Sequence, residues 1–108
     1  MDISMQTISL HDVYHEPINV VKSSTVFLHG IAHGDIHVSG NSQIIIHGIV
    51  HGNIYVESGS SVEIPGIVYA ATINPGGLVT ISGNVQCQNL DLNSVRIMPK
   101  AIINGTTY

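Results

Sequence analysis

The chain has 108 residues and a mass of 11.5 kDa, which suits one domain of ordinary size. Charged residues make up 9% and hydrophobic residues 44%, which excludes the composition of a disordered chain. The formal net charge of -4 argues against a nucleic-acid-binding protein, because such a protein needs a basic surface to follow the phosphates.

The sequence also favours a cytoplasmic protein that does not associate with membranes. Its apolar runs are far shorter than the ~20 residues that cross a bilayer, and MDISMQTISL lacks the pattern of a signal peptide.

The single Cys87 cannot form an internal disulfide, and no cysteine pair suggests a zinc knuckle. We therefore expect no cofactor.

The composition predicts an all-β protein. Isoleucine and valine together number 29, whereas leucine and alanine number 9, and β-branched residues favour strands. The clusters SGNSQ, ESGSS and NPGG predict frequent turns, and no segment has the 3.6-residue periodicity of a helix.

An internal repeat of about eighteen residues organises the chain after a short N-terminal extension, residues 1–7. The first three lines of the repeat read ISLHDVYH, VFLHGIAH and IIIHGIVH, and the next three read VEIPGIVY, VTISGNVQ and VRIMPKAI. These lines start at Ile8, Val26, Ile44, Val62, Val79 and Val95. The period shortens from 18 to 17 to 16, so residues 8–108 are predicted to form one domain of five full lines and a partial sixth.

Alternation within each line predicts which side chains point inward. In the second line the inward set is Val26, Leu28, Gly30, Ala32, Gly34, Ile36 and Val38. Glycines at two recurring inward positions indicate sharp bends, and polar turns at 39–43, 57–61 and 74–77 end the lines. We therefore predict a triangular coil of three short strands per line. Coils stacked at about 4.8 Å would form a single-stranded parallel β-helix of about six rungs.

The rival fold is a left-handed hexapeptide helix, which needs an apolar residue at every sixth position. The inward residues of the second line do not follow that spacing, so this fold ranks second.

The strings HGIAHGDIHV and HGIVHGNIYV resemble the G-x-V-x-G-D-I rung pattern of bactofilins, the bacterial polymer-forming cytoskeletal proteins. The resemblance covers roughly residues 26 to 85. It implies a right-handed triangular β-helix whose subunits join end to end into filaments without nucleotide. We expect the present chain to differ in having almost no tails beyond the helix and in carrying columns of histidine.

The two terminal rungs are the predicted sites of self-association, because an uncapped β-helix exposes core side chains and unpaired backbone groups. The residues expected at these ends are Ile8 and Leu10 in the first rung, and Val95, Ile97 and Ile103 in the last. The alternative is that residues 1–7 and 104–108 fold over the ends as plugs.

Six of the seven histidines are predicted to form two outward columns, and an aliphatic column lies between them. One histidine column is His11, His29 and His47, and the other is His15, His33 and His51. The aliphatic column of Val13, Ile31, Ile49 and Ile67 is a candidate lateral interface for another copy or for one protein partner.

Three hypotheses describe the histidine columns: a plain stacked ladder, a metal site, or a pH sensor. Imidazoles on neighbouring rungs lie about 4.8 Å apart at the backbone, so two nitrogens could reach one zinc ion. Protonation of all seven histidines would change the formal charge from -4 to +3 and place like charges side by side. The plain ladder is the interpretation that the repeat itself favours.

Little in the sequence indicates catalysis. Asp35 and Asn53 fit turn positions, and Cys87 has the inward parity of a small core residue. Acyl transfer with a column histidine as base is the enzyme alternative. We expect a non-enzymatic structural protein that polymerises end to end into a cytoskeletal scaffold. The alternative is a compact protein-binding module, of the inhibitor or immunity type, that docks a partner through an open end or the histidine and isoleucine face.

Overall fold

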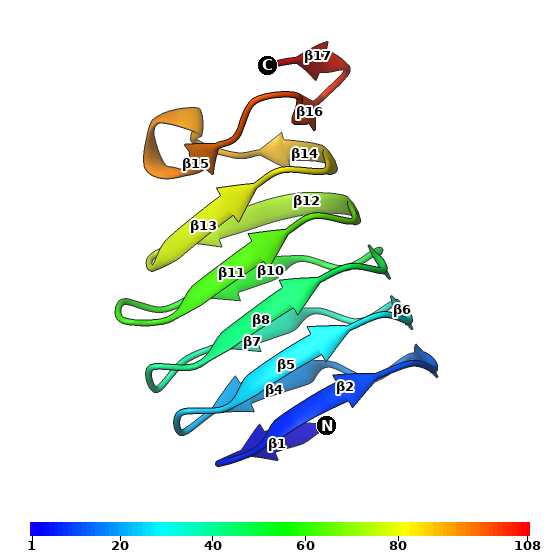
Figure 1. Cartoon of the computed structure of the whole chain (residues 1–108), viewed down its shortest axis with the longest axis vertical. Coiled ribbons are helices and arrows are strands. Elements are labelled where there is room, and N and C mark those ends of the chain that lie inside the picture. Colours follow the sequence, from blue (N-terminus) through cyan, green and yellow to red (C-terminus); the bar gives the residue numbers. More distant parts are fainter.

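The protein folds as a parallel β-solenoid of about six turns. The computed structural model describes all 108 residues, from Met1 to Tyr108. Figure 1 shows the coils stacked along the long axis, with the two chain termini at opposite ends. The molecule measures 35 × 27 × 21 Å, and the fold class predicted from the repeat is confirmed.

The first side of the solenoid is a six-stranded parallel sheet. Its strands, in spatial order, are β2 (Thr7–Leu10), β5 (Thr25–Leu28), β8 (Gln43–Ile46), β11 (Ser61–Ile64), β13 (Leu78–Ile81) and β15 (Arg96–Ile97). The pairing follows the repeat, since Ile8 lies opposite Val26 and Val26 opposite Ile44.

The other two sides form an eleven-stranded sheet. The second side begins with three short strands, β3 (Val13–Tyr14), β6 (Ile31–Ala32) and β9 (Ile49–Val50). The third side begins with β1 (Asp2–Ser4), β4 (Ile18–Val21), β7 (Ile36–Val38) and β10 (Ile54–Val56). The later strands of this sheet are β12 (Ile67–Pro75), β14 (Asn84–Asn89), β16 (Ile102–Ile103) and β17 (Thr106–Thr107). A short 3-10 helix, η1 (Leu92–Ser94), precedes β15.

The inward parity predicted from the sequence forms one continuous core. Twenty-four buried residues make a single hydrophobic cluster that runs through every coil. Val26, Leu28 and Ala32 are fully buried, whereas Phe27, His29 and Ile31 face solvent or are partly covered. Each fully buried valine, leucine or isoleucine stabilises the fold by about 1.5 to 3 kcal/mol. One coil alone cannot bury these side chains, so the stability of the fold comes from the stacking of coils.

Glycine at the first corner of the coil is required by the close approach of the coil before it. A Cβ atom on Gly48 would lie 1.9 Å from the carbonyl oxygen of Gly30, and that oxygen accepts a hydrogen bond from the N–H of Ile49. The backbone of Gly48 therefore occupies space that a side chain would need. The bend predicted at this position is present, and contact between coils is its physical reason.

The second corner disappears in the fourth coil, where β12 runs without interruption along two sides. Ala70 stands where the coil before it has Gly52, and a Cβ at Gly52 would lie 2.1 Å from the carbonyl oxygen of Gly34. The side chain of Ala70 does not fit so tight a corner, so the chain widens. The pairing shift between coils rises from 18 residues at Ile67 to 19 at Ile73, which marks one extra residue at this corner, and it falls to 17 at Leu78 because the next turn is shorter.

The first residues of the chain belong to the solenoid. The strand β1 pairs with β4 in parallel, with Ile3 opposite Val20, and Ile3 is buried in the core. The sequence predicted a short extension over residues 1–7, whereas three of these residues add a strand to the third side. No helix in the structure has the length and apolar character that crossing a membrane requires.

Candidate functional site

The N-terminal coil leaves three strand edges without a partner. The strands β1, β2 and β3 pair on one side only, with β4, β5 and β6. The carbonyls of Gln6, just before β2, and of Leu10, at its end, accept hydrogen bonds from the N–H groups of Thr25 and His29, both at 2.8 Å. Because bonding groups alternate along a parallel strand, the N–H and C=O groups of Thr7 and Ser9 point away from β5. This edge is a template for a further strand.

The side chains predicted to form the sticky ends are more buried than expected. Leu10 is 5% exposed and Ile103 is 2% exposed, so both belong to the core of their own chain. Ile8, Val95 and Ile97 are partly buried and pack against that core. The expectation that a triangle of bare core side chains lies at each end is therefore wrong for Leu10 and Ile103. The backbone edges of the terminal coils are what the protein exposes.

Tyr14 explains why the first coil does not expose its core. Its inward position corresponds to Ala32 in the next coil, and its larger ring packs against the core cluster. The Tyr14 hydroxyl accepts a hydrogen bond from the N–H of Asp12 at 3.3 Å. Beside it, the N-terminal amine donates to the carbonyl of Pro17 at 2.7 Å and lies 3.6 Å from the Glu16 carboxylate. These groups cover the end of the core and leave the strand edges free.

The C-terminal end is closed on one side. After β16, the chain reverses and β17 pairs with β16 in antiparallel fashion, with Ile103 opposite Thr106. The N–H of Lys100 donates to the carbonyl of Tyr108 at 2.6 Å, and the N–H of Tyr108 donates to the carbonyl of Ala101 at 2.8 Å. Only β15 retains an open edge on the first side. The predicted alternative of a terminal plug is thus present over one side of this end.

The two histidine columns form stacked ladders on the second side. Ring centroids lie 5.0 and 4.9 Å apart from His11 through His29 to His47, with interplanar angles of 5° and 3°. From His15 through His33 to His51 the separations are 5.0 and 5.1 Å, with angles of 7° and 9°. All six rings are exposed, so the outward parity and the stacking predicted from the repeat are both present.

The aliphatic column lies between the ladders, as the sequence predicted. Val13 and Ile31 are paired neighbours, as are Ile31 and Ile49, and Ile49 and Ile67. Val13 is 51% exposed, whereas the three isoleucines are partly buried. The column therefore presents a moderate apolar surface, widest at the first coil.

The seventh histidine takes part in a third stack that the sequence analysis missed. His37 in β7 pairs with Tyr55 in β10, and their ring centroids are 4.8 Å apart with an interplanar angle of 14°. These two residues are 18 positions apart in the sequence, and this spacing could have predicted that their rings stack. Tyr69 continues the second histidine column, with its ring centroid 5.3 Å from that of His51.

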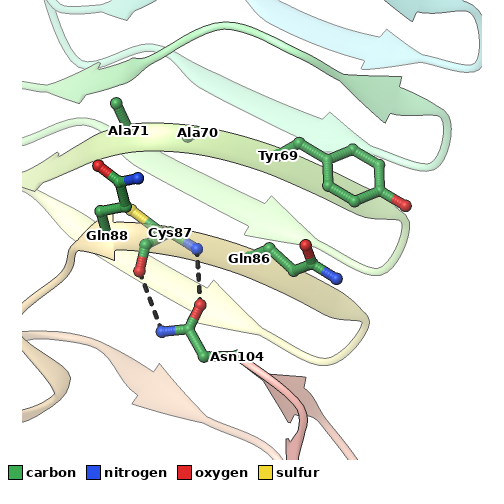
Figure 2. Close-up of a pocket in the computed structure, with 7 residues that line it drawn as sticks. All are labelled: Tyr69, Ala70, Ala71, Gln86, Cys87, Gln88 and Asn104. Atoms are coloured by element: carbon green, nitrogen blue, oxygen red, sulfur yellow. Dashed lines mark hydrogen bonds between the residues drawn. The ribbon is translucent and has the colours of Figure 1, made fainter.

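A shallow depression of about 590 Å³ surrounds Cys87, where β12, β14 and the end of β16 meet (Figure 2). Its lining residues are Tyr69, Ala70, Ala71, Gln86, Cys87, Gln88 and Asn104. The Asn104 amide holds the backbone of Cys87: its oxygen accepts from the Cys87 N–H at 2.8 Å, and its nitrogen donates to the Cys87 carbonyl at 3.0 Å.

The Cys87 thiol has the environment of a core side chain. Cys87 is 4% exposed, and its thiol donates to the carbonyl of Asn89 at 3.5 Å. Burial raises the pKa of the Cys87 thiol, against the smaller lowering effect of backbone hydrogen bonds to Asn89 and Ile73. The neutral thiol is a poor nucleophile, so the geometry supports the predicted packing role.

Two polar ladders inside the coils are structural features that sequence reasoning missed or left as turns. The Ser42 hydroxyl accepts from the N–H of Ser24 at 3.0 Å, and the Ser60 hydroxyl accepts from the N–H of Ser42 at 3.2 Å. Likewise the Asp35 carboxylate accepts from the N–H of Asn53 at 2.9 Å. The signal for the serines was a polar residue of inward parity recurring every 18 positions. Each ladder provides hydrogen-bond acceptors for backbone N–H groups at a turn. Asp35 and Asn53 therefore have a structural role.

The chain contains no group of three or more His, Cys, Asp or Glu side chains placed to hold a metal ion together. Comparisons of the chain with protein-family models, with curated proteins and with solved structures found no match. The strand edges, the histidine ladders and the depression at Cys87 are the candidate functional features of the protein.

Proposed function

We propose that the protein is a non-enzymatic, self-assembling structural protein whose copies join end to end into a cytoskeletal scaffold of the cytoplasm. The open edge of β2, with the outward backbone groups of Thr7 and Ser9, is the observation that carries this proposal. The resemblance of the rung pattern to that of bactofilins supports it. In this proposal Ile8, Val95 and Ile97, which are partly buried at the ends, pack against the neighbouring copy.

Strand addition is the physical basis of the association. A parallel solenoid repeats the same backbone pattern at every coil, so a second copy that aligns its terminal coil continues the hydrogen-bond ladder. Each new backbone hydrogen bond contributes about 0.5 to 1.5 kcal/mol net. At the N-terminal end, the strands β1, β2 and β3 offer edges on all three sides of the coil. This end therefore offers the more complete template for the neighbouring copy.

The C-terminal end has a different role, because β17 already occupies the outer edge of β16. Growth at this end uses the open edge of β15 or displaces β17, which has two residues in its strand. In a filament that continues the ladder, each junction joins an N-terminal coil to a C-terminal coil, so we expect displacement of β17 to be the slow step of growth.

The β17 hairpin also favours a second candidate function. A rod that is closed on one side of one end and open at the other suits a compact binding module, in which β1, β2 and β3 accept a strand of a different protein. The two candidates differ in whether the protein associates with itself.

Replacement of Ser9 by proline tests the proposed assembly. Proline removes the outward N–H of the edge strand and is tolerated there, because this N–H bonds to no strand in the single chain. We expect the wild-type protein to form filaments under negative-stain electron microscopy, and Ser9→Pro to sediment as a monomer. Ser9→Ala is the matched control, since it shortens the same side chain and keeps the N–H.

Circular dichroism and thermal melting establish that Ser9→Pro is folded. Filaments of Ser9→Pro as abundant as those of the wild type would refute association through the β2 edge. A wild-type protein that remains a monodisperse monomer would refute self-assembly and leave the binding module.

A further inference from the structure

The histidine ladders place imidazole rings at a spacing close to what a shared metal ion requires. Neighbouring rings in both columns are 4.9 to 5.1 Å apart between centroids and almost parallel. Parallel rings on successive coils point the same nitrogen atoms in the same direction. All of these rings are exposed on the second side of the solenoid.

Neutral imidazole is a preferred ligand of zinc, copper and nickel. With metal-to-nitrogen bonds of about 2.0 to 2.1 Å, two imidazole nitrogens on one ion lie roughly 3 to 3.5 Å apart. Rings that start about 5 Å apart have to bring these nitrogens closer by about 0.8 to 1 Å each, and each ring has to turn out of the parallel stack so that its in-plane lone pair points at the shared ion. An exposed side chain makes such a movement by turning about its own bonds, without any change in the backbone.

The ladder geometry also limits each column to one ion. The central ring, His29 or His33, has a neighbour on both sides, whereas the outer rings of a column are two coils and roughly 10 Å apart. Two outer rings cannot share an ion. The two columns themselves are separated by the aliphatic column, so pairs form along a column and not across the face.

We propose that each histidine column binds one imidazole-preferring divalent transition-metal ion, such as Cu²⁺ or Zn²⁺, through its central histidine and one neighbour. The chain then binds two ions. No third His, Cys, Asp or Glu side chain joins either pair, so water completes the coordination and the ions exchange with solvent. The net charge of -4 favours cation binding. This site is independent of the proposed self-assembly.

Titration of the tag-free, chelator-stripped full chain with Cu²⁺, followed by electron paramagnetic resonance, tests the proposal. We expect two equivalents of bound copper per chain, each with two nitrogen ligands. Zn²⁺ followed by calorimetry should give the same stoichiometry. Acidification should release both ions, because protons compete for the imidazole nitrogens.

Single substitutions separate a shared ion from ions on single histidines. His29→Gln leaves His11 and His47 too far apart and should reduce the stoichiometry from two to one. His11→Gln leaves the pair of His29 and His47 and should keep two. His29→Gln combined with His33→Gln should abolish binding at the same copper concentration.

His37→Gln is the matched control, because His37 is stacked on Tyr55 outside both columns, and the stoichiometry should stay at two. Equal loss in His29→Gln and His11→Gln would overturn the proposal, as would a wild-type spectrum with one nitrogen per copper. Sedimentation of the same samples in chelator reports on self-assembly separately, so failure of one proposal is distinguishable from failure of the other.

Discussion

Replacement of Gly48 by alanine tests the idea that contact between successive coils dictates glycine at the first corner. The added Cβ would lie 1.9 Å from the carbonyl oxygen of Gly30. An ordinary contact needs about 3.4 Å or more, so the two coils have to separate locally by about 1.5 Å. This displacement acts on the hydrogen bonds that join the coils at the corner. The N–H of Gly48 donates to the carbonyl of Leu28 at 2.9 Å, and the N–H of Ile49 donates to that of Gly30 at 3.1 Å.

The expected loss of stability follows from these contacts. Two weakened hydrogen bonds contribute about 1 kcal/mol each, and the overpacked corner adds about 2 kcal/mol of strain. A total of about 4 kcal/mol is a large part of the 5 to 15 kcal/mol typical of a small domain. For a chain of this size, it lowers the melting temperature by roughly 15 to 25 °C.

Thermal unfolding followed by circular dichroism measures the effect, with Gly105→Ala as the control. Gly105 has a φ of 83° and no atom within 4 Å of an added Cβ, so its substitution carries only backbone strain of about 1 to 2 kcal/mol. A melting temperature for Gly48→Ala that falls no further than that of Gly105→Ala would refute the reasoning from close approach between coils.

Two further predictions concern the interior. Ser42→Ala removes the acceptor for the buried N–H of Ser24 and should reduce stability by about 1 to 2 kcal/mol, whereas the exposed Ser58→Ala should leave it unchanged in denaturant titration. Because burial raises the pKa of the Cys87 thiol above its ordinary value of 9.0, the stability that the neutral thiol contributes is complete below that pH and is lost as the pH rises through the raised pKa. Cys87→Ala should remove this alkaline loss, and an unchanged alkaline profile would contradict the assignment.

The sequence by itself determined the architecture of the coils and the outward ladders. In a solenoid, the residue 18 positions later lies directly above, so a repeat in sequence is also a column in space. For this reason the inward parity of Val26 and Leu28, the corner at Gly48 and the stacking of His29 on His47 could all be predicted without a structure. These features depend on local alternation and on one repeated translation.

Only the tertiary structure decided what happens where the repeat breaks. The terminal coils have a neighbour on one side, and nothing in the repeat states which residues cover the other. Tyr14 covers the core at one end, and β17 folds back over β16 at the other. Leu10 and Ile103 are buried at these ends, and the open backbone edge of β2 becomes the candidate site. The repeat thus predicts contacts between equivalent positions, whereas contacts at the ends depend on side-chain size and on chain reversal.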